Sequence, residues 1–249
     1  MKKSILIIFL FISVLASAGQ KDTWIKANEM YSTSDYTGAL EQYIEISNSG
    51  YFSKELFYNI ANCYFKLKDY GHSILYYERA LKFNPSDKDI LRNIEIARDY
   101  TLDKIEVLPE FILRTWMRNL NYSFSANTWS YAGLLFVSIS LLLFIVFKYT
   151  FRSAVRKLSF IGVIPGAVFG MSAFIFSWSQ VGDFKNKDYA IIMKAVVAVK
   201  SSPDEAGKDV FILHEGTKVK IIDKIARWNR VVLTDGRDGW IQEESREII

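Results

Sequence analysis

The chain has 249 residues, 50% of them hydrophobic, and a formal net charge of +4 at pH 7. This length accommodates two small domains and a membrane element. The basic excess lies mainly in residues 148–157, which hold four Lys or Arg and no acid, whereas residues 183–249 carry 12 basic and 12 acidic side chains. Because no predicted domain has a concentrated positive charge, we exclude a nucleic-acid-binding protein.

Residues 1–18 have the pattern of a secretory signal peptide. Two lysines precede an apolar run from Ile5 to Leu15, and the sequence Ala-Ser-Ala at 16–18 fits the A-x-A cleavage pattern. The apolar run is too short to span a bilayer comfortably. We therefore expect the following domain to be exported.

Residues 19–108 are predicted to form helical hairpins, because apolar residues recur at helical spacing and Pro and Gly are sparse. At an offset of 34 residues the segment aligns with itself. The matched pairs are Trp24 with Tyr58, Ala27 with Ala61, Asn28 with Asn62, Tyr36 with Tyr70, and Tyr43 with Tyr77. With Ala80, Leu81 and Pro85, this pattern resembles the tetratricopeptide repeat. The resemblance implies an all-α solenoid of two repeats and a third helix from Lys88 to Tyr100.

The resemblance also implies a concave surface, lined by the first helix of each repeat, that binds extended or helical peptides. Trp24, Asn28 and Tyr31 of the first copy match Tyr58, Asn62 and Phe65 of the second. Asn59 lies nearby, and Arg92 lies at the start of the third helix. Aromatic residues at this spacing equally suit internal packing, but a buried amide needs hydrogen-bond partners. Trp24, Asp89 and Asn93 replace the Lys and Arg with which some family members hold a carboxylate, so we do not expect a free carboxylate as the ligand.

Residues 109–128 form a predicted amphipathic linker. Its EFILRTWMRNL stretch interleaves Phe111, Ile112, Trp116 and Leu120 with two arginines. Such a helix either lies in the membrane interface or packs on the first domain as a connector.

Two apolar segments without charge, residues 129–147 and 158–178, approach the roughly 20 residues that a helix needs to cross a bilayer. The basic loop between them, residues 148–157, is of the kind retained in the cytoplasm. Both predicted ectodomains then lie on the periplasmic side of the inner membrane. The alternative is a buried hairpin in a soluble core, whose helices are seldom uncharged on all faces.

The second apolar segment carries Gly162, Gly166 and Gly170 on one helix face. Such a face lets another helix approach closely, and its partner is either the first segment or another protein. Pro165 is expected to kink the helix. Neither segment has an ionisable residue, so an ion or proton pathway has no support.

Residues 179–249 change to short β-type runs rich in Val and Ile, which indicate a small all-β barrel. These runs are Ala195 to Val199, Phe211 to Leu213, Val219 to Ile222, and Arg230 to Leu233. The stretches HEGTKV and DGRDGWI, with Trp228 between them, resemble the bacterial SH3 (SH3b) domain. The family's usual Asn-Val-Arg-Ser-Gly beginning is absent at 198–202, which weakens the implied glycan- or peptide-binding face. Trp228 and Trp240 are candidate surface contacts, with barrel packing as the alternative.

No catalytic arrangement is recognisable in the sequence. The only histidines, His72 and His214, lie in different predicted domains, and no metalloprotease, phosphate-loop or dinucleotide pattern occurs. The single cysteine, Cys63, cannot form an internal disulfide and is expected to be a small core residue. We expect no enzyme activity, no cofactor and no metal.

The order of signal peptide, repeats, membrane hairpin and SH3b domain, with the LPEFILRTWMRNL linker, resembles the BatE-type proteins of the aerotolerance (Bat) operon. The resemblance implies an inner-membrane protein acting beside von Willebrand factor A-type membrane partners in envelope or oxidative-stress physiology. We expect a non-enzymatic scaffold with two periplasmic binding modules. The alternatives are a cell-wall anchor or sensor whose SH3b domain binds peptidoglycan and, with least support, an oligomeric pore.

Overall fold

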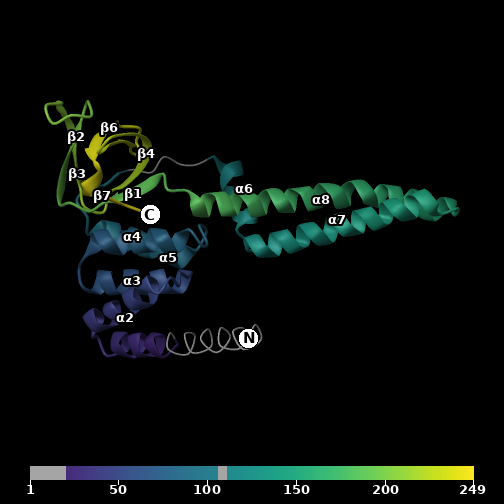
Figure 1. Cartoon of the computed structure of the whole chain (residues 1–249), viewed down its shortest axis with the longest axis horizontal. Helices are drawn as coiled ribbons and strands as arrows, with labels where there is room; N and C mark the ends of the chain where they lie inside the picture. The colour runs from purple at the N-terminus through teal and green to yellow at the C-terminus, as the bar shows by residue number, and fades with distance from the viewer. Residues whose placement is uncertain (1–20, 106–110) are drawn as a thin grey trace, which may run out of the picture. The chain divides into compact units, whose positions relative to one another are not determined.

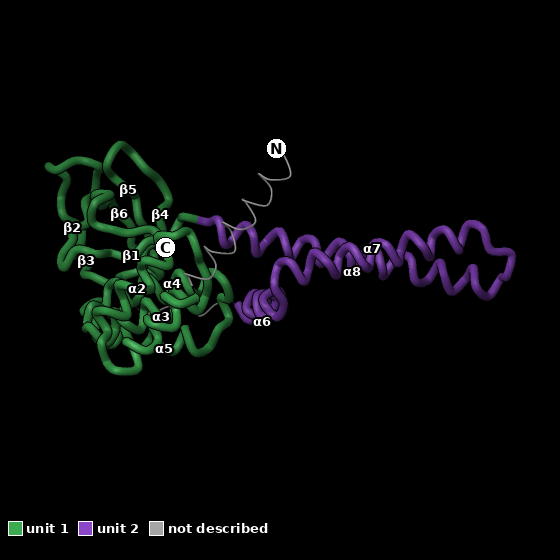
Figure 2. The backbone as a smooth tube through the Cα atoms, turned by 60° about the horizontal axis from the view of Figure 1, so that its bottom comes forward, with its two compact units in different colours: residues 1–108, 187–249 green, residues 109–186 purple. Residues whose placement is uncertain are grey.

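The computed structural model describes residues 21–105 and 111–249. The predicted signal peptide, residues 1–18, lies outside the described residues. The chain divides into two compact units (Figure 2): unit 1 comprises residues 1–108 and 187–249, and unit 2 comprises residues 109–186. Unit 2 is therefore inserted into unit 1 along the chain.

The first part of unit 1 is a stack of antiparallel helices (Figure 1). Residues 21–32 are helical. The helices that follow are α2 (Tyr36–Asn48), α3 (Lys54–Lys66), α4 (Tyr70–Leu81) and α5 (Lys88–Asp99). The helical-repeat prediction is confirmed, since two helical hairpins and a third leading helix occur in the expected order.

The helix starts and turns obey the 34-residue period. Asp35 and Asp69 cap α2 and α4 by accepting hydrogen bonds from the backbone N–H three residues ahead. The residues before these caps, Ser34 and Lys68, have φ of 68° and 64°. This left-handed conformation turns the chain within each hairpin, and residues other than glycine adopt it at a steric cost in free energy.

Small residues let the paired helices approach closely. Ala27, Ala39, Ala61 and Ala80 are fully buried, and Ser73 donates from Oγ to the carbonyl of Ala61 at 3.0 Å. Large aromatic and aliphatic side chains fill the space around these contacts. The sequence pattern of small residues is therefore a packing pattern.

The second part of unit 1 is a sheet of seven antiparallel strands. The strands are β1 (Tyr189–Ile192), β2 (Val196–Lys200), β3 (Asp209–His214), β4 (Lys218–Ile225), β5 (Trp228–Val232), β6 (Asp238–Gln242) and β7 (Arg246–Ile248). Their order, β3-β2-β6-β5-β4-β1-β7, ends at β3 and β7, so the pairing among the described residues does not close into a barrel. The four predicted strands correspond to β2, β3, β4 and β5, whereas β1, β6 and β7 were not predicted.

The sheet packs directly on the repeat helices. Ile74 and Leu75 of α4 and Ala97 of α5 form one fully buried cluster with Ile191 of β1. The sequence predicts the repeats and the β segment as separate modules, but the structure joins them in one compact unit. The sheet covers the apolar end of the helical stack, which an isolated repeat array leaves exposed.

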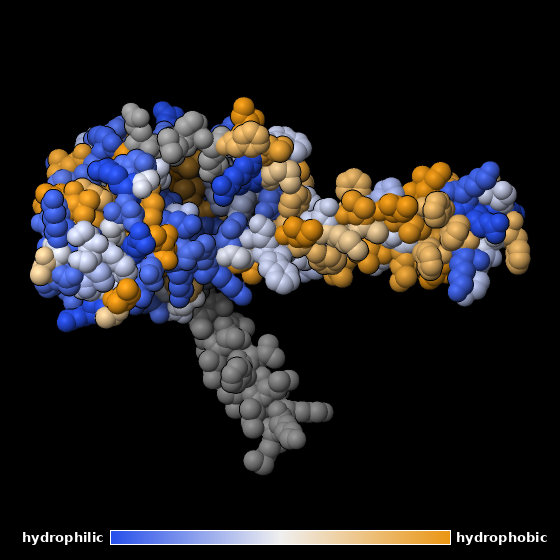
Figure 3. Space-filling view, turned by 90° about the horizontal axis from the view of Figure 1, so that it is seen from above, coloured by the Kyte–Doolittle hydropathy of each residue, from blue (hydrophilic) through white to orange (hydrophobic). Residues whose placement is uncertain are grey.

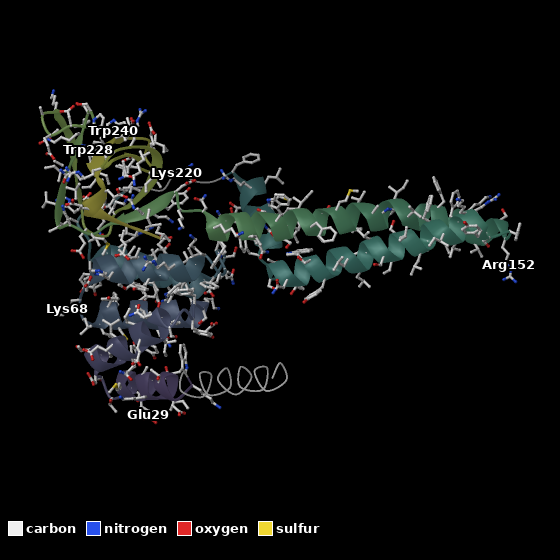
Figure 4. All side chains as sticks on the ribbon, viewed as in Figure 1. Glu29, Lys68, Arg152, Lys220, Trp228 and Trp240 are labelled. Atoms are coloured by element: carbon white, nitrogen blue, oxygen red, sulfur yellow. The ribbon has the colours of Figure 1, made fainter. Side chains whose placement is uncertain are left out.

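Unit 2 consists of α6 (Ile112–Asn121), α7 (Ala126–Tyr149) and α8 (Ser153–Lys185). Helices α7 and α8 form an antiparallel hairpin whose tip carries Arg152 (Figure 4). Both are long and apolar enough to cross a membrane. Hydrophobic residues are gathered along the hairpin surface (Figure 3), and α8 continues through Pro165 as one helix.

Candidate functional site

The predicted groove residues make the same contacts in both repeats. The rings of Trp24 and Tyr43 meet edge-on at 5.5 Å between centroids, and those of Tyr58 and Tyr77 meet at 5.7 Å. Each pair joins the first helix of a repeat to the second. The aromatic groove positions therefore take part in internal packing while remaining partly exposed.

The asparagines at the groove are hydrogen-bonded to the same tyrosines. Tyr43 donates to Oδ1 of Asn28, and Tyr77 donates to Oδ1 of Asn62, each at 2.5 Å. An amide has a carbonyl oxygen and an NH₂ group, and these bonds engage the carbonyl oxygen. The fixed amides are structural in part, which explains why they occur at equivalent positions.

A second set of amides joins neighbouring repeats. Asn59 donates from Nδ2 to the hydroxyl of Tyr43 at 3.3 Å, and Asn93 donates to the hydroxyl of Tyr58 at 2.9 Å. Asn93 is 34 residues after Asn59, but the two contacts are not equivalent: Tyr43 lies on the second helix of its repeat, whereas Tyr58 lies on the first. The bond between Asn93 and Tyr58 therefore joins α5 to α3, the leading helices of neighbouring repeats.

The remaining predicted groove residues extend the surface in both directions. Tyr31 packs edge-on against Tyr36 at 5.3 Å, and Phe65 packs in the same way against Tyr70 at 5.7 Å. Arg92 on α5 is exposed. The predicted groove residues are thus mostly aromatic or amide side chains, and Arg92 is the cationic residue among them.

A pocket that the sequence did not predict lies where the repeats meet the sheet. It has a volume of about 190 Å³ and is lined by Lys68, Tyr70 and Tyr100 on one side and by His214 and Glu215 on the other. The rings of Tyr70 and Tyr100 stack at 4.7 Å. Because its walls come from segments more than 100 residues apart, no local sequence pattern indicates it.

One wall of this pocket is held by a partly buried aspartate. Asp103 accepts hydrogen bonds at 2.7 Å from the backbone N–H of His214 and from Oγ1 of Thr217, and its Oδ1 lies 2.7 Å from Nδ1 of His214. Burial raises the pKa of Asp103, but the hydrogen bonds from Thr217 and His214 outweigh it and hold that pKa below its usual range. The charged side chain of Asp103 therefore connects the segment after α5 to the sheet through hydrogen bonds.

The two tryptophans of the sheet differ in exposure. Trp240 on β6 is only 9% exposed and packs into the sheet, whereas Trp228 at the start of β5 is partly exposed (Figure 4). Of the two predicted surface contacts, the structure therefore leaves Trp228 as the more accessible side chain.

The three glycines of α8 lie against α7. A Cβ built at Gly166 would lie 3.2 Å from the Cβ of Ser140, and one at Gly170 would lie 2.6 Å from a methyl group of Val137. A Cβ at Gly162 would likewise meet Leu143 at 2.8 Å. The sequence left the partner of this face open, and in the structure its partner is the first apolar helix of the same chain.

The described residues contain no group of three His, Cys, Asp or Glu side chains that could hold a metal ion. Cys63 is fully buried, and burial raises the pKa of its thiol to about 12. At neutral pH this thiol is therefore protonated and a poor nucleophile.

Comparison with known proteins agrees with the helical architecture. The family model of the tetratricopeptide repeat matches residues 55–87, which cover α3 and α4. No curated protein matches the chain. The chain therefore contains a tetratricopeptide repeat, a module that suggests protein–protein interaction.

Proposed function

We propose that the protein is a non-enzymatic, membrane-anchored adaptor whose repeat helices bind a segment of a protein partner. The observation that carries this proposal is the preorganised surface of the first helices, where aromatic and amide side chains are fixed at a 34-residue spacing. An extended or helical peptide fits such a surface, because aromatic faces and amide donors bind it without a charged clamp.

Membrane anchoring is supported by the α7–α8 hairpin. Its exposed surface consists mostly of Leu, Ile, Val and Phe side chains. Exposure of so large an apolar area to water would be unfavourable. The basic residues of the loop at its tip favour a cytoplasmic location for the loop. In this topology both ends of the hairpin, and unit 1 with them, are periplasmic at the inner membrane.

The resemblance to BatE-type proteins supports a more specific partner class. It implies membrane proteins with von Willebrand factor A-type domains and a role in envelope or oxidative-stress physiology. The adaptor presents the repeats and the SH3b-like sheet as one compact unit, which differs from two modules held apart.

The proposal is tested by site-specific photocrosslinking in membranes. A photoreactive residue replaces the exposed Asn28 or Arg92 of the groove, and a matched control replaces the exposed Glu45 of α2. We expect Asn28 and Arg92 to capture the same membrane protein and Glu45 to capture none. Equal capture at all three positions, or none, would contradict binding by the groove.

A second candidate function is a cell-wall anchor or sensor, which the partial exposure of Trp228 and the SH3b resemblance favour. Sedimentation of the detergent-solubilised protein with purified sacculi tests it. Retention that is lost in Trp228→Ala supports the anchor, and absence of retention rules it out in favour of the adaptor.

A further inference from the structure

Helix α6 presents an apolar face that no described residue of unit 2 covers. Apolar side chains recur at three- and four-residue spacing, which places them on one side of the helix. They are Ile112, Leu113, Trp116, Met117 and Leu120, all exposed, with Ile112 at 84% and Trp116 at 61%. Arg114, which is exposed, and Arg118, which is partly buried, lie on the opposite side, and no acidic residue occurs from Phe111 to Thr128.

The C-terminal end of α6 is fixed to the α7–α8 hairpin. The buried side chain of Gln180 on α8 donates from Nε2 to the carbonyls of Asn121 and Phe124 at 2.7 and 2.9 Å. Trp129 on α7 donates from Nε1 to the same Asn121 carbonyl at 2.7 Å. Because the last carbonyls of a helix lack partners within it, these side chains complete the end of α6 and hold it in place.

The attachment point lies at a defined depth. Gln180 follows the start of the apolar stretch at Leu158 by about 33 Å of helix, at about 1.5 Å per residue. The hydrocarbon core of a bilayer is about 30 Å thick, so a helix that enters it at Leu158 leaves it beside Gln180. The end of α6 is thereby held where acyl chains meet headgroups.

From these observations we propose that α6 lies in the plane of the membrane surface, at the end of the hairpin away from the basic loop. Its apolar face enters the upper acyl chains, and the exposed Arg114 faces anionic lipid headgroups. The lipid is the occupant that fits, because the apolar face continues the exposed apolar surface of the hairpin and the opposite face carries only positive charge. This inference rests on the proposed membrane span.

The test uses spin labels on the full chain in vesicles of phosphatidylethanolamine and phosphatidylglycerol. Cys63→Ala provides the background, since Ala97 occupies the equivalent buried position one repeat later. Labels replace Leu113, Trp116 or Leu120 on the apolar face, or the exposed Arg114 on the polar face. Collision with oxygen, which concentrates in lipid, is compared with collision with a water-soluble nickel chelate.

At the apolar positions we expect oxygen collision to exceed nickel collision at least threefold, with the reverse order at Arg114. Low collision with both reagents at the apolar positions would mean that protein covers the face, and high nickel collision would mean that it lies in water. Either result overturns the inference.

A label at the exposed Leu142 of α7 separates this inference from the proposed function. High oxygen collision at Leu142 together with water-like values at Trp116 refutes only the interfacial helix. Water-like values at Leu142 itself refute the membrane span and, with it, the interfacial helix.

Discussion

The carboxylate of Glu78 on α4 lies 2.6 Å from the ammonium of Lys218 on β4, although 140 residues separate them along the chain. Its other oxygen accepts a hydrogen bond from Arg98 of α5 at 3.1 Å. The Glu78 side chain is only 6% exposed, so one buried carboxylate joins two repeat helices and the sheet.

This triad predicts the effect of removing the charge. We expect Glu78→Gln to lower the free energy of unfolding by about 2 kcal/mol, because two cations lose their shared partner while remaining partly hydrated. Chemical denaturation of the detergent-solubilised chain measures the loss. Glu45→Gln on the exposed surface of α2 is the control, with an expected change within about 0.5 kcal/mol. Equal effects of the two substitutions would show that the triad does not stabilise the unit.

Packing between sheet and repeats predicts that both unfold together. Ile191→Ala removes a fully buried side chain that meets Ile74 and Leu75, and we expect a loss of about 3 kcal/mol. Hydrogen exchange measures the response on each side of the contact. Protection of amides in α3 and in β5 should fall by similar amounts, whereas a loss confined to the sheet would mean that the repeats fold independently.

The hydrogen bonds of Asp103 predict that the stability of the folded protein depends on pH in the acidic range. Because the folded-state pKa of Asp103 is lowered, its contribution to stability is present at neutral pH and is lost as the pH falls through that pKa, below about pH 4. Asp103→Asn should therefore be less stable than the wild type by about 1 to 2 kcal/mol at pH 7, and the difference should shrink towards pH 3. Unfolding curves at pH 7, 5 and 3 measure this. A stability difference between the two proteins that stays constant with pH would contradict a charge-dependent contact at Asp103.

The contact between α7 and α8 predicts a position-specific effect of glycine replacement. Gly166→Leu places a large side chain where even a Cβ lies 3.2 Å from Ser140, so we expect the helices to separate and the thermal midpoint to fall by several degrees. Gly182 of the same helix has open space around it and serves as the control. Thermal unfolding in detergent distinguishes them, and equal midpoints for Gly166→Leu and Gly182→Leu would refute close packing at Gly166.

The left-handed turn at Ser34 predicts a stabilising substitution. Ser34 has φ of 68°, a conformation that glycine adopts without steric cost. We expect Ser34→Gly to raise the free energy of unfolding by about 0.5 to 1 kcal/mol, net of the extra freedom that glycine gives the unfolded chain. Ser49→Gly is the comparison, because Ser49 has an ordinary φ of −73° and should gain nothing. Denaturant titration of both variants decides the point.

Much of the fold follows from local sequence patterns. The 34-residue period predicted the helical hairpins, because matched small and aromatic residues can occupy matched places only if the backbone repeats. The charge-free segments predicted the two long helices, because hydropathy is also a property of a short stretch of chain. Strands β1 and β7 were missed because they are only four and three residues long, too short to show an alternating pattern. Strand β6 begins with Asp238 and Gly239, which are typical of a turn.

The candidate site was predictable only in part. The sequence identified Asn28 and Asn62 as equivalent groove positions, but it did not show that Tyr43 and Tyr77 bind their amide oxygens. The pocket beside Tyr70 and Tyr100 had no sequence signal, because its far wall comes from His214 and Glu215.

The sequence by itself determined the helical repeat and the two apolar helices, since periodicity and hydropathy are properties of short stretches of chain. Only the tertiary structure decided that the glycine face of α8 packs on α7, that Trp240 is buried, and that Glu78 meets Lys218. These outcomes depend on which surfaces the folded backbone brings together across long distances in the chain. Apolar burial and charge pairing then select one set of contacts between distant segments, and this set cannot be predicted from residue spacing alone.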